Sequence, residues 1–241
     1  MYYYEWVVWY TMYLNRRYHF WSYHTSLCPL MASTSHIVMA EDHMDGLYRS
    51  RNPLVRYVHN GRLDAIVKLV PDGVRTILDA GCGEGHLLER LCEAGKGVEL
   101  WGVDATKVAV ERARMRCPSA RIVEGDIARL PFKDESVGVI VCTEVIEHVP
   151  EYDEVLREFK RVLQPNGLLI ISFPNERLWT IARALLLRRP IRVPDHVNSF
   201  SPYTMSMATR GLWSVGVKNL PFGLPFWLSL NCVMVFKKQY F

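Results

Sequence analysis

The chain contains one stretch of alternating glycines that could bring backbone atoms close to a ligand, Asp79-Ala80-Gly81-Cys82-Gly83-Glu84-Gly85. It follows an apolar run at residues 74–78 that we interpret as a buried strand, and a helical pattern begins at His86. Glycines between a strand and a helix allow backbone N–H groups to approach a bound molecule. The dinucleotide fingerprint, Gly-x-Gly-x-x-Gly, receives a pyrophosphate, whereas these glycines occur at every second residue behind a carboxylate. The leading Asp79 favours a ligand that carries an amine and a sulfonium over one that carries phosphates.

Two more carboxylates follow apolar runs that we interpret as strands. Asp104 follows residues 98–103, and Asp126 lies in the loop that leaves a third run, residues 120–127. An acid at the tip of a second parallel strand can accept hydrogen bonds from both hydroxyls of a ribose. A structural role is the alternative, because Asp104 could cap the next helix and Asp126 could serve a turn. Three acids at successive strand ends behind a glycine loop favour a ligand site.

A second group of chemically capable residues follows a fourth apolar run, residues 136–143. Glu144, Glu147 and His148 have the spacing i, i+3, i+4, which places them on one face of a helical turn. Two carboxylates and an imidazole suit a hard divalent ion such as Mg²⁺ or Mn²⁺, and His196 in a later loop could be a fourth ligand. Without a metal, His148 is the candidate general base, with Glu144 as the second candidate catalytic residue.

The elements that would position these residues alternate between strands and helices. Further strands are expected at residues 168–172, after a turn at 163–167, and at 231–236, and helices are expected at 106–116 and 152–163. Such alternation predicts βαβ units and a parallel sheet that is covered on both faces. Ligands of such sheets bind beyond the carboxyl ends of the strands, where all of the acids named above are expected.

Taken together, the glycine stretch and the acids at the strand ends resemble the motifs of the class I S-adenosylmethionine-dependent methyltransferases, of the methyltransferase type 11 kind. The resemblance covers roughly residues 47–238. It implies an α/β, Rossmann-like fold with a seven-stranded, mostly parallel sheet and helices on both faces. It also implies that S-adenosyl-L-methionine is bound by the following residues: Asp79, Gly81, Gly83, Gly85, Asp104, Ala105, Asp126, Ile127 and Cys142. Asp104 would contact the ribose, Asp126 the adenine amino group, and Ile127 the face of the base.

The metal candidates resemble residues of two branches of this family, the ubiquinone-biosynthesis O-methyltransferases and the small-RNA 2′-O-methyltransferases. In both, the ion would hold an adjacent pair of hydroxyls and lower the pKa of the one that is methylated. The sequence Glu147-His148-Val149-Pro150 after the fourth strand is also common in members that have no metal. A metal at Glu144, Glu147, His148 and His196 and a metal-free His148 base therefore both stay open.

The composition is consistent with one catalytic domain that has additions. A chain of 241 residues is long enough for a single α/β core, and its net charge of +4 is dispersed rather than gathered into a nucleic-acid-binding stripe. We therefore expect no nucleic-acid partner. The six cysteines show no Cys-x-x-Cys spacing, which favours a reducing, cytoplasmic location.

Residues 1–44 differ in composition from the rest, with eleven aromatic residues within the first 23 positions. The apolar run there is too short to span a bilayer, so it could be an aromatic anchor at a membrane surface. The alternative, which we favour, is an upstream start codon, with translation beginning at Met39 or Met44. The methyltransferase-like domain would then be residues 45–241, with an insertion at about 176–199.

The expected insertion contains an apolar helical segment, residues 178–190, that ends in arginines, and an apolar loop at 220–228 precedes the last strand. The segment could be a lid over a lipophilic acceptor, a peripheral contact with a membrane, or a helix buried in the fold. We therefore expect methyl transfer to an oxygen of a small-molecule or lipid-like acceptor. The alternatives are a ribose 2′-O-methyltransferase acting on RNA, which the dispersed charge disfavours, and a cofactor-binding scaffold without activity.

Overall fold

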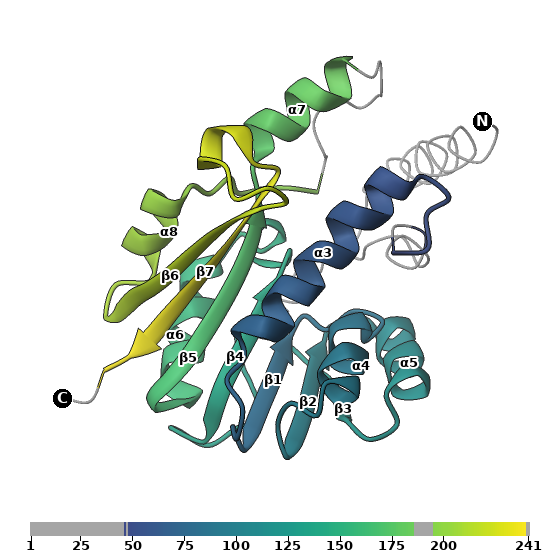
Figure 1. The fold of residues 1–241 in the computed structure, drawn as a ribbon. Coiled ribbons are helices and arrows are strands. Elements are labelled where there is room, and N and C mark those ends of the chain that lie inside the picture. Colours follow the sequence, from purple (N-terminus) through teal and green to yellow (C-terminus); the bar gives the residue numbers. More distant parts are fainter. Residues whose placement is uncertain (1–45, 47, 186–194, 240–241) are drawn as a thin grey trace, which may run out of the picture. The chain divides into compact units, whose positions relative to one another are not determined.

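A seven-stranded sheet with the strand order β3-β2-β1-β4-β5-β7-β6 organises the chain (Figure 1). The computed structural model describes residues 46, 48–185 and 195–239. Five strands run parallel: β1 (Thr76–Ala80), β2 (Glu99–Asp104), β3 (Arg121–Glu124), β4 (Val137–Thr143) and β5 (Leu163–Pro174). The strand β7 (Asn231–Lys238) pairs antiparallel with β5, and β6 (Leu212–Leu220) pairs antiparallel with β7. The predicted α/β fold with a mostly parallel sheet is therefore confirmed.

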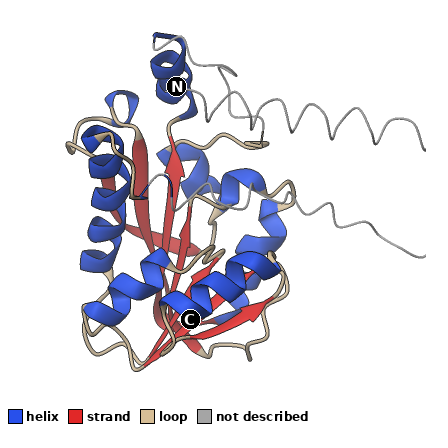
Figure 2. Ribbon diagram, turned by 90° about the vertical axis from the view of Figure 1, so that its right-hand side faces the viewer, coloured by secondary structure: helices blue, strands red, loops and turns tan. Residues whose placement is uncertain are grey.

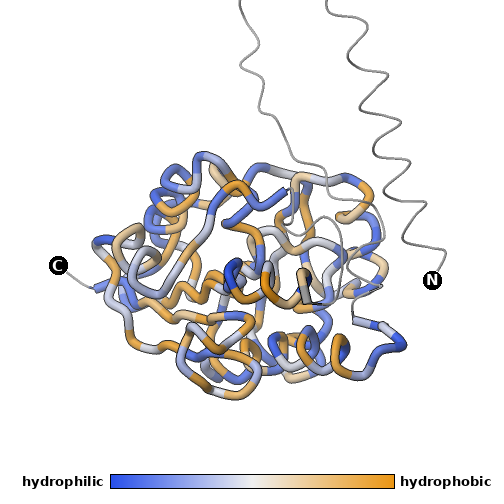
Figure 3. The backbone as a smooth tube through the Cα atoms, turned by 90° about the horizontal axis from the view of Figure 1, so that it is seen from above, coloured by the Kyte–Doolittle hydropathy of each residue, from blue (hydrophilic) through white to orange (hydrophobic). Residues whose placement is uncertain are grey.

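Helices cover both faces of this sheet (Figure 2). The helical elements are α3 (Pro53–Leu69), α4 (His86–Glu93), α5 (Lys107–Arg116), the 3₁₀ turn η1 (Ile146–His148), α6 (Tyr152–Val162), α7 (Glu176–Leu185), α8 (Pro202–Ala208) and the 3₁₀ turn η2 (Phe226–Leu228). Side chains of α6 pack in the core on one face, and those of α3, α4 and α5 pack in the core on the other. Hydrophobic and hydrophilic residues alternate along the helical turns (Figure 3), as expected where one side of a helix covers a sheet.

The central strand β4 explains why apolar residues occupy consecutive positions in the fourth apolar run of the sequence. Ile140 and Cys142 belong to the core on the α6 face, whereas Val139 and Val141 belong to the core on the opposite face. All four residues are at most 1% exposed. A strand that is buried on both faces needs apolar side chains at every position, which is typical of parallel sheets.

The turn predicted at residues 163–167 is wrong as a strand boundary, because β5 already begins at Leu163. Leu163 pairs with Val137 and Leu168 pairs with Val139, so the residues between them form an irregularity in the ladder. Asn166 has a φ of 63°, a conformation that asparagine tolerates better than most residues. The Pro-Asn-Gly signal in the sequence therefore marks a bulge within β5 and not a loop before it.

The structure describes none of the predicted N-terminal extension and only part of the predicted insertion. Residues 1–45 lie outside the described residues, so the extension at 1–44 and the boundary at 45 stay predictions. Of the predicted helical segment at 178–190, the structure describes α7 as far as Leu185, and residues 186–194 lie outside the described part. None of the helices in the described ranges combines the length and the apolar character needed to cross a membrane.

Candidate active site

The predicted glycine loop connects β1 with α4 and lies at the carboxyl ends of β1 and β2. Gly81, Gly83 and Gly85 have φ values of 79°, 50° and 81°, which favour glycine. A Cβ atom on Gly81 would lie 2.4 Å from Val145 Cγ2, and one on Gly85 would lie 3.0 Å from Ala113 Cβ. Gly83 differs, because, apart from its two chain neighbours, no atom of the described residues lies within 4 Å of the place where its Cβ would be. Open space at the tip of the loop is where a ligand could approach the backbone.

The acid at the end of β2 lies directly against this loop. Asp104 Oδ2 accepts a hydrogen bond of 2.8 Å from the Gly83 N–H, and Asp104 Oδ1 accepts one of 2.9 Å from the Thr106 N–H. Asp104 is therefore not the predicted cap of α5, whose N-cap residue is Thr106 without a side-chain cap hydrogen bond; Asp104 instead closes a local turn with Thr106. A carboxylate oxygen can accept more than one hydrogen bond, so this bonding orients Asp104 without preventing contact with a ligand.

The loop after β3 carries the next two predicted residues. Asp126 Oδ1 accepts a hydrogen bond of 2.8 Å from the Ala128 N–H, which is the predicted turn role, and Ile127 is 8% exposed. Ala105, the predicted neighbour on the β2 side, is exposed. Cys142 is fully buried in the core on the α6 face, so the structure gives no support for a ligand contact there.

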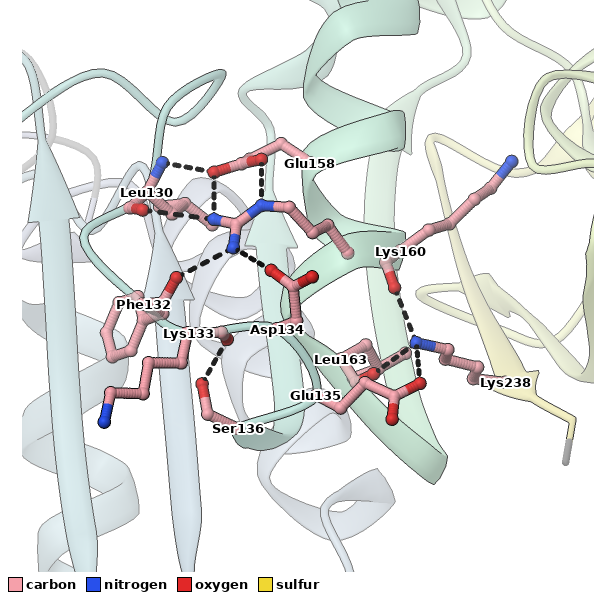
Figure 4. A network of polar contacts seen from close by, with 11 residues as sticks. Leu130, Phe132, Lys133, Asp134, Glu135, Ser136, Glu158, Lys160, Leu163 and Lys238 are labelled. Carbon is pink, nitrogen blue, oxygen red and sulfur yellow. Dashed lines mark hydrogen bonds and ion pairs between the residues drawn. The ribbon is translucent and has the colours of Figure 1, made fainter.

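A polar network fixes the loop that carries Asp126 and Ile127 onto α6 (Figure 4). The Arg161 guanidinium donates to Glu158 Oε1 and Oε2 at 2.7 and 2.8 Å, and to the carbonyl oxygen of Phe132 at 2.9 Å. Glu158 Oε1 also accepts from the Leu130 N–H at 2.6 Å. Bidentate contacts between arginine and a carboxylate are geometrically specific. Arg161 and Glu158 of α6 therefore fix the position of this loop.

Asp79, at the end of β1, has the most unusual electrostatic surroundings of the three acids. It is 2% exposed. Burial, followed by the nearby charge of Asp104, raises the pKa of Asp79 to about 8. A buried carboxyl group of this kind gains its charge most readily when a cation comes into contact with it.

Glu144 lies outside the helical turn that its spacing to Glu147 and His148 predicted. Its φ is 54°, and η1 begins only at Ile146. The Glu144 carboxylate forms an ion pair of 3.3 Å with Arg62 Nη1 and accepts hydrogen bonds of 3.0 Å from Ser172 Oγ and 2.9 Å from Asn231 Nδ2. Partners on α3, β5 and β7 therefore hold Glu144, and its predicted convergence with Glu147 and His148 is wrong.

Arg62 is a site residue that the sequence analysis missed. It lies on α3 and is 2% exposed. Burial opposes its charge, but the facing Glu144 carboxylate raises the pKa of Arg62 above its usual value. The only signal in the sequence is an arginine directly before the buried Leu63, on the apolar side of a helix.

The structure brings together three of the four predicted metal-site residues. Glu147, His148 and His196 each offer one ligand atom, and these atoms lie within 4.8 Å of one another. The segment that carries His196 is bound to η1, because the N–H groups of Val197 and Asn198 both donate to the Glu147 carbonyl oxygen at 3.0 Å. Two segments far apart in the sequence thus meet at this group.

The ring nitrogens of the two histidines are oriented by their partners. His148 Nδ1 lies 2.9 Å from the Asp195 carbonyl oxygen, and His196 Nδ1 lies 2.5 Å from Glu176 Oε1. With Nδ1 engaged on both rings, Nε2 is the nitrogen left for a ligand. Contacts of this kind, from Nδ1–H to a carbonyl or a carboxylate, are typical around metal-binding histidines. Glu176, which begins α7, was missed by the sequence analysis.

Glu147 carries an unusual carboxyl group. It is 1% exposed, and neither carboxyl oxygen has a hydrogen-bond partner among the described residues. Burial, followed by the charge of Glu144, raises the pKa of Glu147 well above its usual range. A buried polar group without a partner is costly, unless a proton or a cation satisfies it. Burial also lowers the pKa of His148, which favours its neutral form.

Comparison with known proteins identifies the family of this fold. Residues 78–171 match the protein family described as "Methyltransferase domain". Over these residues the chain carries a methyltransferase domain of the class I, S-adenosylmethionine-dependent kind. The chain is 38% identical over 101 residues to a Mycobacterium tuberculosis protein named as a probable S-adenosylmethionine-dependent methyltransferase, a match that covers 42% of this chain and 36% of that protein.

A second relative is the mitochondrial ubiquinone biosynthesis O-methyltransferase of Schizosaccharomyces pombe. It is 30% identical over 163 residues, which cover 62% of this chain and 55% of that protein. The chain thus spans from about a third to just over half of the length of these two relatives.

Solved structures share the fold of this chain. An S-adenosylmethionine-dependent methyltransferase from Thermotoga maritima has a TM-score of 0.61 at 23% identity, covering 76% of this chain and 91% of that chain. A chain from the complex between the Haloferax volcanii Trm112 methyltransferase activator and a methyltransferase has a TM-score of 0.62 at 19% identity, covering 75% and 90%. At such identities the likeness concerns the fold.

Proposed function

We propose that this protein transfers a methyl group from S-adenosylmethionine to an oxygen atom of a small or lipid-like acceptor. The observation that carries the proposal is the open space at Gly83, bordered by a loop whose backbone is bonded to Asp104 and which begins at the buried Asp79. An acidic, backbone-lined site suits a cationic nucleoside better than a phosphate ligand. The position beyond the carboxyl ends of β1 and β2 agrees with the binding rule for such sheets.

The residues on the cofactor side would bind and orient. Asp104 is held by two backbone N–H groups, so its remaining lone pairs could accept both ribose hydroxyls without rearrangement. Asp126 and Ile127 would meet the base, and Asp79 would meet the positive charges of the cofactor. When bound, S-adenosylmethionine supplies an activated methyl group on its sulfonium. The protein then has to align the acceptor, exclude water and remove a proton.

His148 is the residue that could remove this proton. Its Nδ1 is bonded to the Asp195 carbonyl oxygen, which places the ring proton on Nδ1 and leaves the Nε2 lone pair available. Because burial lowers its pKa below the usual 6.5, His148 is neutral at neutral pH and able to act as a base. Glu144 is already paired with Arg62, so we assign it the role of holding Arg62 and the ends of β5 and β7.

A divalent ion such as Mg²⁺ or Mn²⁺ fits the residues Glu147, His148 and His196, as the alternative to the base role of His148, because the ion would take the same Nε2 lone pair. The fit rests on the buried, unpartnered carboxyl oxygens of Glu147 and on two imidazoles whose Nδ1 atoms are already engaged. Glu144 leaves the predicted ligand set, because internal partners occupy it. When bound, the ion would lower the pKa of an acceptor hydroxyl. The remaining task of Asp195 and Glu176 would be to fix the two rings.

The apolar surroundings favour a lipophilic acceptor. Loop residues Phe222 and Trp227 are 66% and 70% exposed. Asn175 joins this loop to the start of α7, because its Nδ2 donates to the Phe226 carbonyl oxygen at 2.7 Å. The next residue, Glu176, holds His196. The exposed apolar loop is therefore connected to the proposed catalytic group through two consecutive residues.

In the decisive experiment, the full chain is incubated with methyl-labelled S-adenosylmethionine and one of three acceptors. The acceptors are a polyprenylated catechol, an unsubstituted catechol and a short RNA duplex. We expect methylation of a catechol oxygen, with the polyprenylated acceptor preferred. His148→Ala should abolish transfer, whereas Asp153→Asn, an exposed change on α6, should not. Labelling of the RNA alone would overturn the proposal, and binding of cofactor without any transfer would favour a scaffold.

A further inference from the structure

Two cysteines outside the proposed active site share one hydroxyl group. Cys92 Sγ lies 3.1 Å from Ser119 Oγ, and Cys117 Sγ lies 3.6 Å from the same oxygen. Cys92 belongs to the last turn of α4, and Cys117 is the residue directly after α5. Two sulfur atoms that contact one oxygen atom are themselves neighbours.

The two thiols differ in access to solvent. Among the five cysteines of the described residues, Cys92 is the exposed one, and all five are free thiols. Cys117 is 2% exposed, and burial raises its pKa. A dissolved reagent would therefore meet Cys92 first, with Cys117 next to it as the second thiol. An exposed thiol beside a second one is the arrangement in which a mixed disulfide is resolved within the protein.

The helices that carry these thiols are already fixed to each other. Glu84, in the glycine loop before α4, accepts a hydrogen bond of 2.7 Å from Arg112 Nη1 on α5, and its carbonyl oxygen accepts one of 2.9 Å from Arg116 Nε. Gly85 packs against Ala113 so closely that a Cβ atom would lie 3.0 Å from Ala113 Cβ. A bond between the two sulfur atoms would therefore join elements whose relative position is set, which limits the movement that closure requires.

We propose that Cys92 and Cys117 form a dithiol site that reacts with small disulfides such as glutathione disulfide and closes to an intramolecular disulfide. The Cys92 thiolate attacks one sulfur of the reagent, forms a mixed disulfide and releases one glutathione thiolate. Cys117 then loses its proton to solvent, attacks Cys92 Sγ and releases the second glutathione. Two protein thiols and one glutathione disulfide thus give one protein disulfide and two glutathione thiols.

The test uses the full chain with Cys28, which lies outside the described residues, replaced by serine in every sample. After incubation with glutathione disulfide, we expect the intact mass to fall by two hydrogens and the number of titratable thiols to fall by two. Peptide mapping should find Cys92 joined to Cys117. A dithiol reductant should restore both thiols.

Two variants separate the steps. Cys117→Ser should stop at a stable glutathione adduct on Cys92, and Cys117→Ala serves in its place if the serine variant does not fold. Cys92→Ser should not react, because the remaining described cysteines are buried. A persistent adduct on Cys92 in the protein with both thiols, or a bond between other cysteines, would overturn the proposal. The readout needs neither cofactor nor acceptor, so it stands or fails separately from the proposed methyl transfer.

Discussion

Replacing Asp79 by asparagine tests the electrostatics of the proposed cofactor site. Burial and the Asp104 charge raise the pKa of Asp79 to about 8, so the group is mostly protonated at pH 6. A cofactor with an amine and a sulfonium prefers the ionised form and has to displace the proton. With a pKa near 8, about half of the groups are ionised at pH 8 and roughly 1% at pH 6. The affinity should therefore fall about fiftyfold between these two values.

The assay is calorimetric titration of the full chain with S-adenosylmethionine from pH 6 to pH 9, in two buffers of different ionisation enthalpy. Below pH 8 the wild-type protein should release close to one proton per cofactor bound. Asp79→Asn should bind about ten- to a hundredfold more weakly at pH 8, since a charge-assisted hydrogen bond contributes ~1.5–3 kcal/mol. The variant should also lose the proton release. The exposed Asp153→Asn variant should behave like the wild type.

The same ionisation affects folding without ligand, and the sign follows from the raised pKa. A carboxyl group with a raised folded-state pKa stabilises the fold fully below its ordinary value of 3.8, and this contribution is lost as the pH rises through about 8. The free energy of unfolding should therefore decrease from pH 6 to pH 9 in the wild type and decrease less in Asp79→Asn. A wild-type affinity that is flat over this range, with no proton released, would refute the reasoning.

Three further predictions follow from the contacts of the site. Arg62→Met should lower the free energy of unfolding, measured in urea, by about 3–5 kcal/mol, because it leaves Glu144 as a buried charge without its partner. The double variant with Glu144→Gln should recover part of this loss, and strictly additive losses would speak against a coupled pair. Gly81→Ala should destabilise the fold, since the new methyl group would lie 2.4 Å from Val145 Cγ2, and Val145→Ala should relieve the clash but not the ~1–2 kcal/mol of left-handed strain. Glu147→Ala should remove the response of methyl transfer to a chelator and to added Mg²⁺, while the cofactor affinity, measured by calorimetry, stays unchanged. A wild-type activity that does not change with the chelator would contradict the metal site and favour metal-free catalysis by His148.

The sequence was sufficient for the strands β1 to β4 and for the acids at their carboxyl ends, because both depend on local pattern, whereas β6 was not located. Apolar runs gave the strands β1 to β4 within a few residues, and the acid that follows each run marks a carboxyl end. The turn role considered for Asp126 depends on a neighbouring residue and is present. The helix-cap role considered for Asp104 is not present, because its carboxylate accepts from the N–H of Thr106, which is itself the N-cap residue of α5. Local hydrogen bonding within two residues is readable from sequence in this way.

The sequence was insufficient where partners come from distant segments. The spacing of Glu144 predicted a helical face, but the ion pair with Arg62 and the hydrogen bonds from Ser172 and Asn231 turn its carboxylate elsewhere. Those partners lie on α3, β5 and β7, and no periodicity connects them with Glu144. Glu176 was missed for the same reason, because its contact with His196 joins two segments that no local pattern connects.

The position of β7 has a consequence for synthesis of the chain on the ribosome. β7 lies between β5 and β6 in the sheet but follows both in the sequence, and among the strands of the described residues β6 pairs with β7 alone. While the chain emerges, the edge of β5 therefore stays open and β6 has no strand to pair with, a state in which unpaired strands are prone to wrong contacts. Asn231, the first residue of β7, also supplies one of the hydrogen bonds to Glu144. We expect the nascent protein to acquire its complete site only after residues 231–238 have left the exit tunnel.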